Sequence, residues 1–132
     1  MSFILFLQNS KIDLGDLMVS LSFLPSAERL TVVLIKARNL RVVDDTRNAS
    51  DPYVKVSLIH GGKKIKKRKT GVYRNTVCPT FNEALTFDIS KDILKNCIIE
   101  FIVCHDSLLG KIKNLEKLKQ QYNFIYFDFR SK

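Results

Sequence analysis

Up to residue 110 the sequence consists of short apolar or alternating segments separated by turn residues, and no long helical period interrupts them. Segment 17–23 alternates apolar side chains with mostly small or polar ones, and segment 30–37 is rich in β-branched residues. Both patterns are typical of strands that bury at least one face. Strands are expected at 17–23, 30–37, 53–59, 64–70, 85–89 and 98–104. Segments this short, at this spacing, predict an all-β fold, an antiparallel Greek-key β-sandwich.

Turn and helix signals fall between these segments and after them. Gly61 and Gly62 predict a hairpin turn, because glycine tolerates positive φ. Segment 90–94 begins with serine and could form a single capped helical turn. Beyond residue 110, segment 111–121 has a helix-like spacing of apolar residues, and segment 122–129 is aromatic and strand-like. An aromatic strand of this kind is an aggregation hazard if it is left exposed.

Length and composition indicate one globular domain. The chain has 132 residues, of which 45% are hydrophobic and 27% charged, which is enough for a proper core. Its three cysteines, Cys78, Cys97 and Cys104, show no metal-ligand spacing and are expected to be reduced thiols. The apolar run 3–7 is too short to cross a bilayer and lacks the features of a signal peptide. Residues 1–13 are therefore interpreted as an N-terminal extension, either an added strand or a disordered start.

The positive charge of the chain is concentrated in one region. The net charge is +9, and residues 52–82 contain eight Lys or Arg and no Asp or Glu. A focused cationic region attracts polyanions such as phosphoinositides, acidic membranes or nucleic acid. The centre of this region is segment 61–70. After the glycine turn, residues 64–70 are expected to form the return strand of the hairpin.

Successive side chains of a strand point to opposite faces. Strict alternation places Lys63, Ile65, Lys67 and Lys69 on one face and Lys64, Lys66 and Arg68 on the other. Both faces are cationic, so neither can be a dry core, and the strand is expected where a sheet face is open. The predicted polyanion-binding residues are Lys63, Lys64, Lys66, Lys67, Arg68 and Lys69.

Several other interpretations of the basic strand are weaker. One or two lysines would be enough to protect a sheet edge from aggregation. A hydrogen-bonded strand is a poor ligand for a nuclear import receptor, although the basic run fits such a signal. Nucleic acid is not expected, because aromatic residues for base stacking do not alternate with the lysines.

An enzymatic function is not expected. His60 and His105 lie outside known catalytic motifs, and Gly61-Gly62 is not followed by the Gly-Lys-Ser/Thr helix of a phosphate-binding loop. Cys104 and His105 are adjacent on a predicted strand, so their side chains should diverge rather than form a dyad.

Five stretches also resemble a known family. They are the opening strands 14–21 and 30–40, the Ser-Asp-Pro-Tyr-Val-Lys-Val signature at 50–56, the basic strand at 63–70, and segment 75–87 with Pro-Thr-Phe-Asn-Glu. Together they resemble the second, membrane-distal C2 domain of the synaptotagmins. The resemblance implies a cytoplasmic β-sandwich, peripheral to vesicle or plasma membranes, that acts in vesicle trafficking or exocytosis. It further implies binding to acidic phospholipids and phosphoinositides, with SNARE proteins or endocytic adaptors as protein partners.

The resemblance implies a calcium site that this sequence supports poorly. Calcium prefers six to eight oxygen ligands, mostly carboxylates. The first loop offers Asp51 with Asp44 or Asp45, but the third loop, 104–110, keeps only Asp106. We therefore expect no calcium cofactor, or one weak site, and a calcium-independent domain.

The resemblance ends after residue 110. The expected organisation is an extension at 1–13, a C2 core at 14–110 and a divergent tail at 111–132. Either the tail completes the sandwich through 122–129, or the chain is a truncated form of a longer protein. An unfilled sheet edge would favour self-association.

Overall fold

The computed structural model describes residues 2–8, 15–40 and 50–106, which form seven strands and two single-turn helices. The elements are β1 (Ser2–Gln8), β2 (Asp16–Leu24), η1 (Pro25–Ala27), β3 (Arg29–Arg38), β4 (Pro52–His60), β5 (Lys63–Lys69), β6 (Thr80–Asp88), α1 (Lys91–Leu94) and β7 (Cys97–His105). Among these residues, neither helix is long and apolar enough to cross a membrane.

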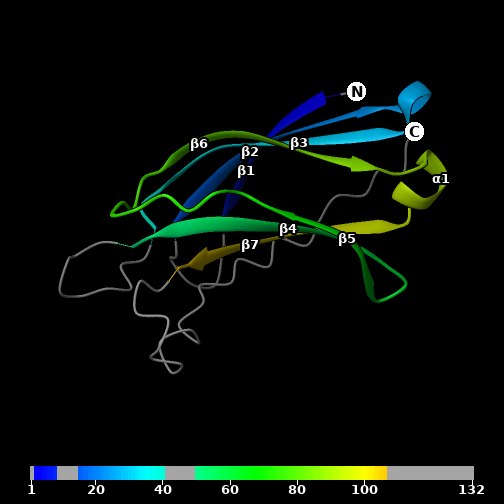
Figure 1. Cartoon of the computed structure of the whole chain (residues 1–132). Coiled ribbons are helices and arrows are strands. Elements are labelled where there is room, and N and C mark those ends of the chain that lie inside the picture. The colour runs from blue at the N-terminus through cyan, green and yellow to red at the C-terminus, as the bar shows by residue number, and fades with distance from the viewer. Residues whose placement is uncertain (1, 9–14, 41–49, 107–132) are drawn as a thin grey trace.

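The strands form two antiparallel sheets that lie face to face (Figure 1). One sheet has the order β1-β2-β3-β6 and the other β5-β4-β7. The chain leaves the first sheet after β3, makes the β4–β5 hairpin in the second, and returns as β6 beside β3. This crossover is of the Greek-key kind, and the predicted antiparallel β-sandwich is confirmed.

The core lies between the sheets and is built mainly from alternate residues of β2, β3, β4, β6 and β7, whereas all seven residues of β5 are exposed. Leu17, Val19, Leu21 and Phe23 on β2 are all buried, as the alternation predicts. Val54, Val56 and Leu58 on β4 face them across the sandwich and are 0% exposed. Burying a side chain of this size contributes about 1.5–3 kcal/mol. The core therefore fixes which face of each strand is left for ligands.

The N-terminal extension supplies the edge strand of the first sheet. β1 pairs with β2 in a regular register from Ser2 opposite Ser22 to Gln8 opposite Asp16. Phe3, Leu5 and Leu7 are partly buried against the core. Of the two alternatives considered for this segment, the added strand is the one observed.

The remaining predictions divide between described and undescribed residues. The helical turn at 90–94 is confirmed, and Ser90 caps it by accepting a hydrogen bond from the Ile93 N–H at 3.4 Å. The helix-like segment 111–121 and the aromatic segment 122–129 lie outside the described residues. Asp44 and Asp45 also lie outside them.

Candidate functional site

The β4–β5 hairpin forms as the glycine pair predicts. Gly61 and Gly62 have φ of +58° and +78° and link His60 directly to its partner Lys63. A two-residue hairpin turn needs positive φ at both positions, which glycine adopts without steric cost. The turn therefore places the basic strand at the edge of the second sheet.

A β-bulge changes which lysines share a face of β5. Leu58 pairs with Lys66 and Ile59 pairs with Lys64, so Ile65 is an extra residue in the ladder. Lys64 consequently lies on the outer face of the sheet with Lys67 and Lys69. The alternation that placed Lys64 on the opposite face was wrong, because a bulge shifts the pleat by one residue.

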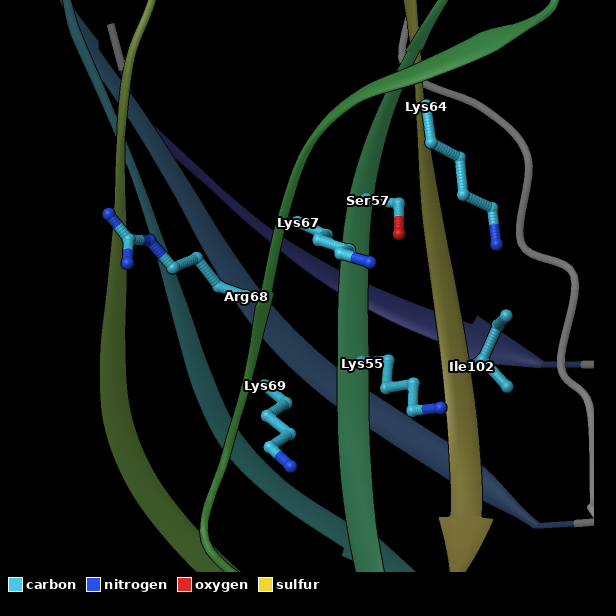
Figure 2. Close-up of a pocket in the computed structure, with 7 residues that line it drawn as sticks. All are labelled: Lys55, Ser57, Lys64, Lys67, Arg68, Lys69 and Ile102. Atoms are coloured by element: carbon cyan, nitrogen blue, oxygen red, sulfur yellow. The ribbon is translucent and has the colours of Figure 1, made fainter.

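The other basic side chains of β5 point in a different direction. Lys66 and Arg68 pair with Leu58 and Val56, residues of β4 whose side chains face the core. Because β5 is an edge strand, these side chains pass the edge of the sandwich, and Arg68 Nε donates a hydrogen bond to the Thr86 carbonyl on β6 at 3.3 Å. Figure 2 shows Arg68 directed toward β6 and away from Lys64 and Lys55. Of the six predicted basic residues, Lys64, Lys67 and Lys69 thus share the outer face, Lys66 and Arg68 point the other way, and Lys63 pairs with His60 beside the turn.

A groove of about 460 Å³ lies on the outer face of the second sheet. Its lysines come from two strands, β4 and β5 (Figure 2). The lining residues are Lys55, Ser57, Lys64, Lys67, Arg68, Lys69 and Ile102. The volume is within the range of about 300–1,000 Å³ that is usual for ligand pockets.

Lys55 is a groove residue that the sequence interpretation did not select. It lies on β4 between Lys69 on one side and Ile102 on the other. Its ammonium is 5.9 Å from the centre of the Tyr53 ring. Burial, and secondarily the neighbouring Cys104, raises the pKa of Tyr53 to about 12, so the phenol stays neutral even in alkaline solution. The alternation of 53–59, which already placed Lys55 opposite the core residues, was the signal that could have identified it.

A carboxylate also faces this cationic surface. Glu100 on β7 lies in a cross-strand row with Ser57 and Lys67, and its Oε1 is 3.4 Å from Lys64 Nζ. Within the described residues Oε1 makes no hydrogen bond, so the contact with Lys64 is an ion pair only. Because four lysines line the groove, it retains an excess of positive charge.

Of the predicted calcium residues, the structure describes Asp51 and Asp106. They lie at the end of the sandwich where β4 begins and β7 ends, which we call the loop end. The Asp106 N–H donates to the Asp51 carbonyl at 2.9 Å, and both carboxylates contact the Arg74 guanidinium. Cys104, which was expected in the third loop, lies on β7 and is buried. Among the described residues no group of three or more His, Cys, Asp or Glu side chains could hold a metal ion.

An antiparallel sandwich with a basic hairpin on one sheet and paired aspartates at the loop end has the features of a C2 domain. A sequence model described as "C2 domain" matches residues 28–121, and the chain belongs to this family. Within it, the chain is a C2 domain of the synaptotagmin family. It is 56% identical to human synaptotagmin-9 over 80% of its length and 48% identical to mouse synaptotagmin-3 over 77% of its length.

The chain spans 22% of human synaptotagmin-9 and 17% of mouse synaptotagmin-3. Solved structures support the fold. The third C2 domain of the KIAA1228 protein has a TM-score of 0.64 at 24% identity and covers 90% of this chain and 92% of that domain. The first C2 domain of human synaptotagmin XIII has a TM-score of 0.60 at 15% identity and covers 87% of this chain and 80% of that one. By its sequence relatives, this chain is a synaptotagmin-like C2 domain, a non-catalytic module.

Proposed function

We propose that the chain is a peripheral membrane-binding C2 domain. It recognises acidic phospholipids, including phosphoinositides, through the groove on β4, β5 and β7. The observation that carries the proposal is the convergence of Lys55, Lys64, Lys67 and Lys69 on one open face of a rigid sheet. The full set of motifs resembles the second C2 domain of synaptotagmins, and we assign it to that type. Its setting is then the cytoplasmic surface of a vesicle or plasma membrane during trafficking or exocytosis.

The strength of lysine contacts favours a multivalent headgroup. Each Lys near an anionic leaflet contributes roughly 1 kcal/mol, so four together give about 4 kcal/mol, close to a millimolar dissociation constant. A phosphoinositide presents several phosphates to one groove and adds charge-assisted hydrogen bonds. Tethering to the same membrane would raise the effective affinity further.

Two neighbouring lysines provide a matched test of the groove. Lys67→Glu reverses a charge in the groove, whereas Lys66→Glu makes the same change on the β6 side of the strand. In co-sedimentation with phosphatidylcholine vesicles containing phosphatidylinositol bisphosphate, we expect Lys67→Glu to weaken binding about 30-fold, from about 1 kcal/mol per unit charge. Lys66→Glu should weaken it less than about fivefold, because its charge lies farther from the membrane and is screened. Equal losses, or no wild-type binding at low salt, would contradict the proposal.

The same proposal includes calcium independence, with no cofactor or at most one weak calcium site among Asp44, Asp45, Asp51 and Asp106. It is supported by the position of Arg74, whose Nη1 lies 2.8 Å from Asp106 Oδ2. Vesicle binding should be equal in EGTA and in about 1 mM calcium, a concentration at which weak extracellular-type sites fill. A calcium-dependent increase would favour a weak calcium-dependent phospholipid binder instead.

A protein-interaction module is the second candidate function, and the two-sided charge of β5 favours it. Lys66 and Arg68 remain on the β6 side when the groove is filled, and they suit acidic surfaces of SNARE proteins or endocytic adaptors. This function predicts a saturable complex without lipid, which Lys66→Glu weakens more than Lys67→Glu. Self-association through an open sheet edge is a further proposed interaction, which analytical ultracentrifugation would test.

A further inference from the structure

Arg74 lies between two carboxylates at the loop end of the sandwich. Its Nη1 is 2.8 Å from Asp106 Oδ2 and 3.5 Å from Asp51 Oδ2. Asp51 Oδ1 in turn accepts a hydrogen bond from the Asn75 N–H at 2.7 Å. A planar guanidinium with five donors is suited to bridging two carboxylates in this way.

The Asp51 carboxylate requires a positive partner. Its side chain is 0% exposed, whereas that of Asp106 is 38% exposed and that of Arg74 is 47% exposed. A buried ionised carboxylate without compensation is strongly unfavourable. Arg74 supplies that compensation from a position that still touches solvent.

The backbone on both sides of Arg74 fixes its position. The Tyr73 N–H donates to the Pro52 carbonyl at 2.9 Å, and the Thr76 N–H donates to the Ser50 carbonyl at 2.8 Å. Asn75 adopts a positive φ of +59° between them. On the opposite side, the Asp51 N–H donates to His105 Nδ1 at 3.0 Å and holds the end of β7 in place. These contacts anchor Arg74 and Asp51 to the start of β4 and the end of β7.

The described residues here do not fit a calcium ion while Arg74 is in place. Calcium needs about six to eight oxygens at roughly 2.3–2.6 Å, and the space between these two carboxylates is taken by a cationic group. We propose that Arg74 is a built-in counter-ion, which supplies from within the chain the positive charge that calcium would bring to this end of a C2 domain. The proposal deepens the calcium independence of the proposed function and is separate from lipid binding at the groove.

The test is the thermal stability of Arg74→Gln with and without about 10 mM calcium, well above the range of weak sites. We expect wild-type Tm to be the same in calcium and in EDTA. The Tm of Arg74→Gln should fall by about 5–10 °C in EDTA, because a largely buried carboxylate loses a cationic neighbour. Calcium should then recover a measurable part of that loss, about 2 °C or more by mass action.

Arg38→Gln is the matched control. It removes the same charge and breaks an ion pair of the same length, since Arg38 Nε is 2.8 Å from Asp16 Oδ2, a carboxylate on β2 in the other sheet. Arg38→Gln should show no calcium response. Asp106→Asn in the Arg74→Gln background should abolish the recovery of Tm by calcium. If Arg74→Gln fails to fold, Arg74→Lys provides the test, because it keeps the positive charge and should remain insensitive to calcium.

Three results would overturn the proposal. Calcium could stabilise wild type as much as Arg74→Gln, Arg74→Gln could leave Tm unchanged, or Arg74→Gln could be destabilised without any response to calcium. The last result would make Arg74 only a structural ion-pair partner. None of these results would change the vesicle binding of Lys67→Glu or Lys66→Glu. Failure of the counter-ion proposal is therefore distinguishable from failure of the lipid-binding proposal.

Discussion

Glu100 places a carboxylate among the lysines of the groove. Its side chain is 13% exposed, and its Oε1 is 3.4 Å from Lys64 Nζ. An anionic ligand must compete with this carboxylate for Lys64 and is also repelled by it. At the scale of single residues, Glu100 is therefore expected to weaken the attraction of the groove for acidic membranes.

Replacing Glu100 by Gln should strengthen vesicle binding. One negative charge near the leaflet opposes binding by about 1 kcal/mol, which corresponds to roughly a fivefold gain in affinity when it is removed. Glu28→Gln makes the same charge change at an exposed turn in the other sheet and should have little effect. Vesicle co-sedimentation of both variants measures the difference, and unchanged or weaker binding by Glu100→Gln would refute this role.

At the scale of elements, β1 shows how a strand outside the expected core can become part of the sandwich. Leu5 is partly buried against the core, whereas its neighbour Ile4 is 63% exposed on the outer face. Leu5→Ala should lower the free energy of unfolding by about 1–3 kcal/mol, toward the low end of losses at buried sites. Ile4→Ala should change it by less than about 0.5 kcal/mol. Urea denaturation of the two variants measures the contrast, and equal effects would show that β1 does not pack on the core.

The same elements show what could be predicted from the sequence. β2 and β4 were found because apolar residues that face the core recur at every second position, and a period of two is a local signal. The apolar run of β1 does not alternate, so its assignment as a strand needed its partner β2. The bulge at Ile65 is a property of two paired strands, and no pattern within either strand encodes it.

The loop end required even longer-range information. Asp51 and Asp106 were predicted to meet because a known family implied it. Arg74 was not predicted, since its pairing depends on backbone contacts between segments 50–52 and 73–76. The sequence places a basic residue there, but only the fold brings it between two carboxylates.

At the scale of the whole molecule, stability and binding depend on different forces. The core is formed by apolar residues of both sheets, such as Val32, Leu34, Val56 and Ile99, which are 0% exposed. The proposed binding face is formed by lysines in water on the outside of one sheet. Salt screens the attraction between exposed charges but has little effect on apolar burial. The two properties should therefore respond differently to ionic strength.

Raising NaCl from about 0.1 to about 0.5 M should reduce vesicle binding by at least about tenfold, because the screening length falls to a few ångströms. Over the same range Tm should change by only a few degrees, since moderate salt alters core burial little. A Lys64→Ala/Lys67→Ala variant should show a flatter salt dependence of binding, because fewer charges are left to screen. Parallel vesicle and thermal measurements on the two proteins test this separation. If salt left vesicle binding unchanged, or if the double variant kept the full wild-type slope, the attraction would not arise from the groove lysines.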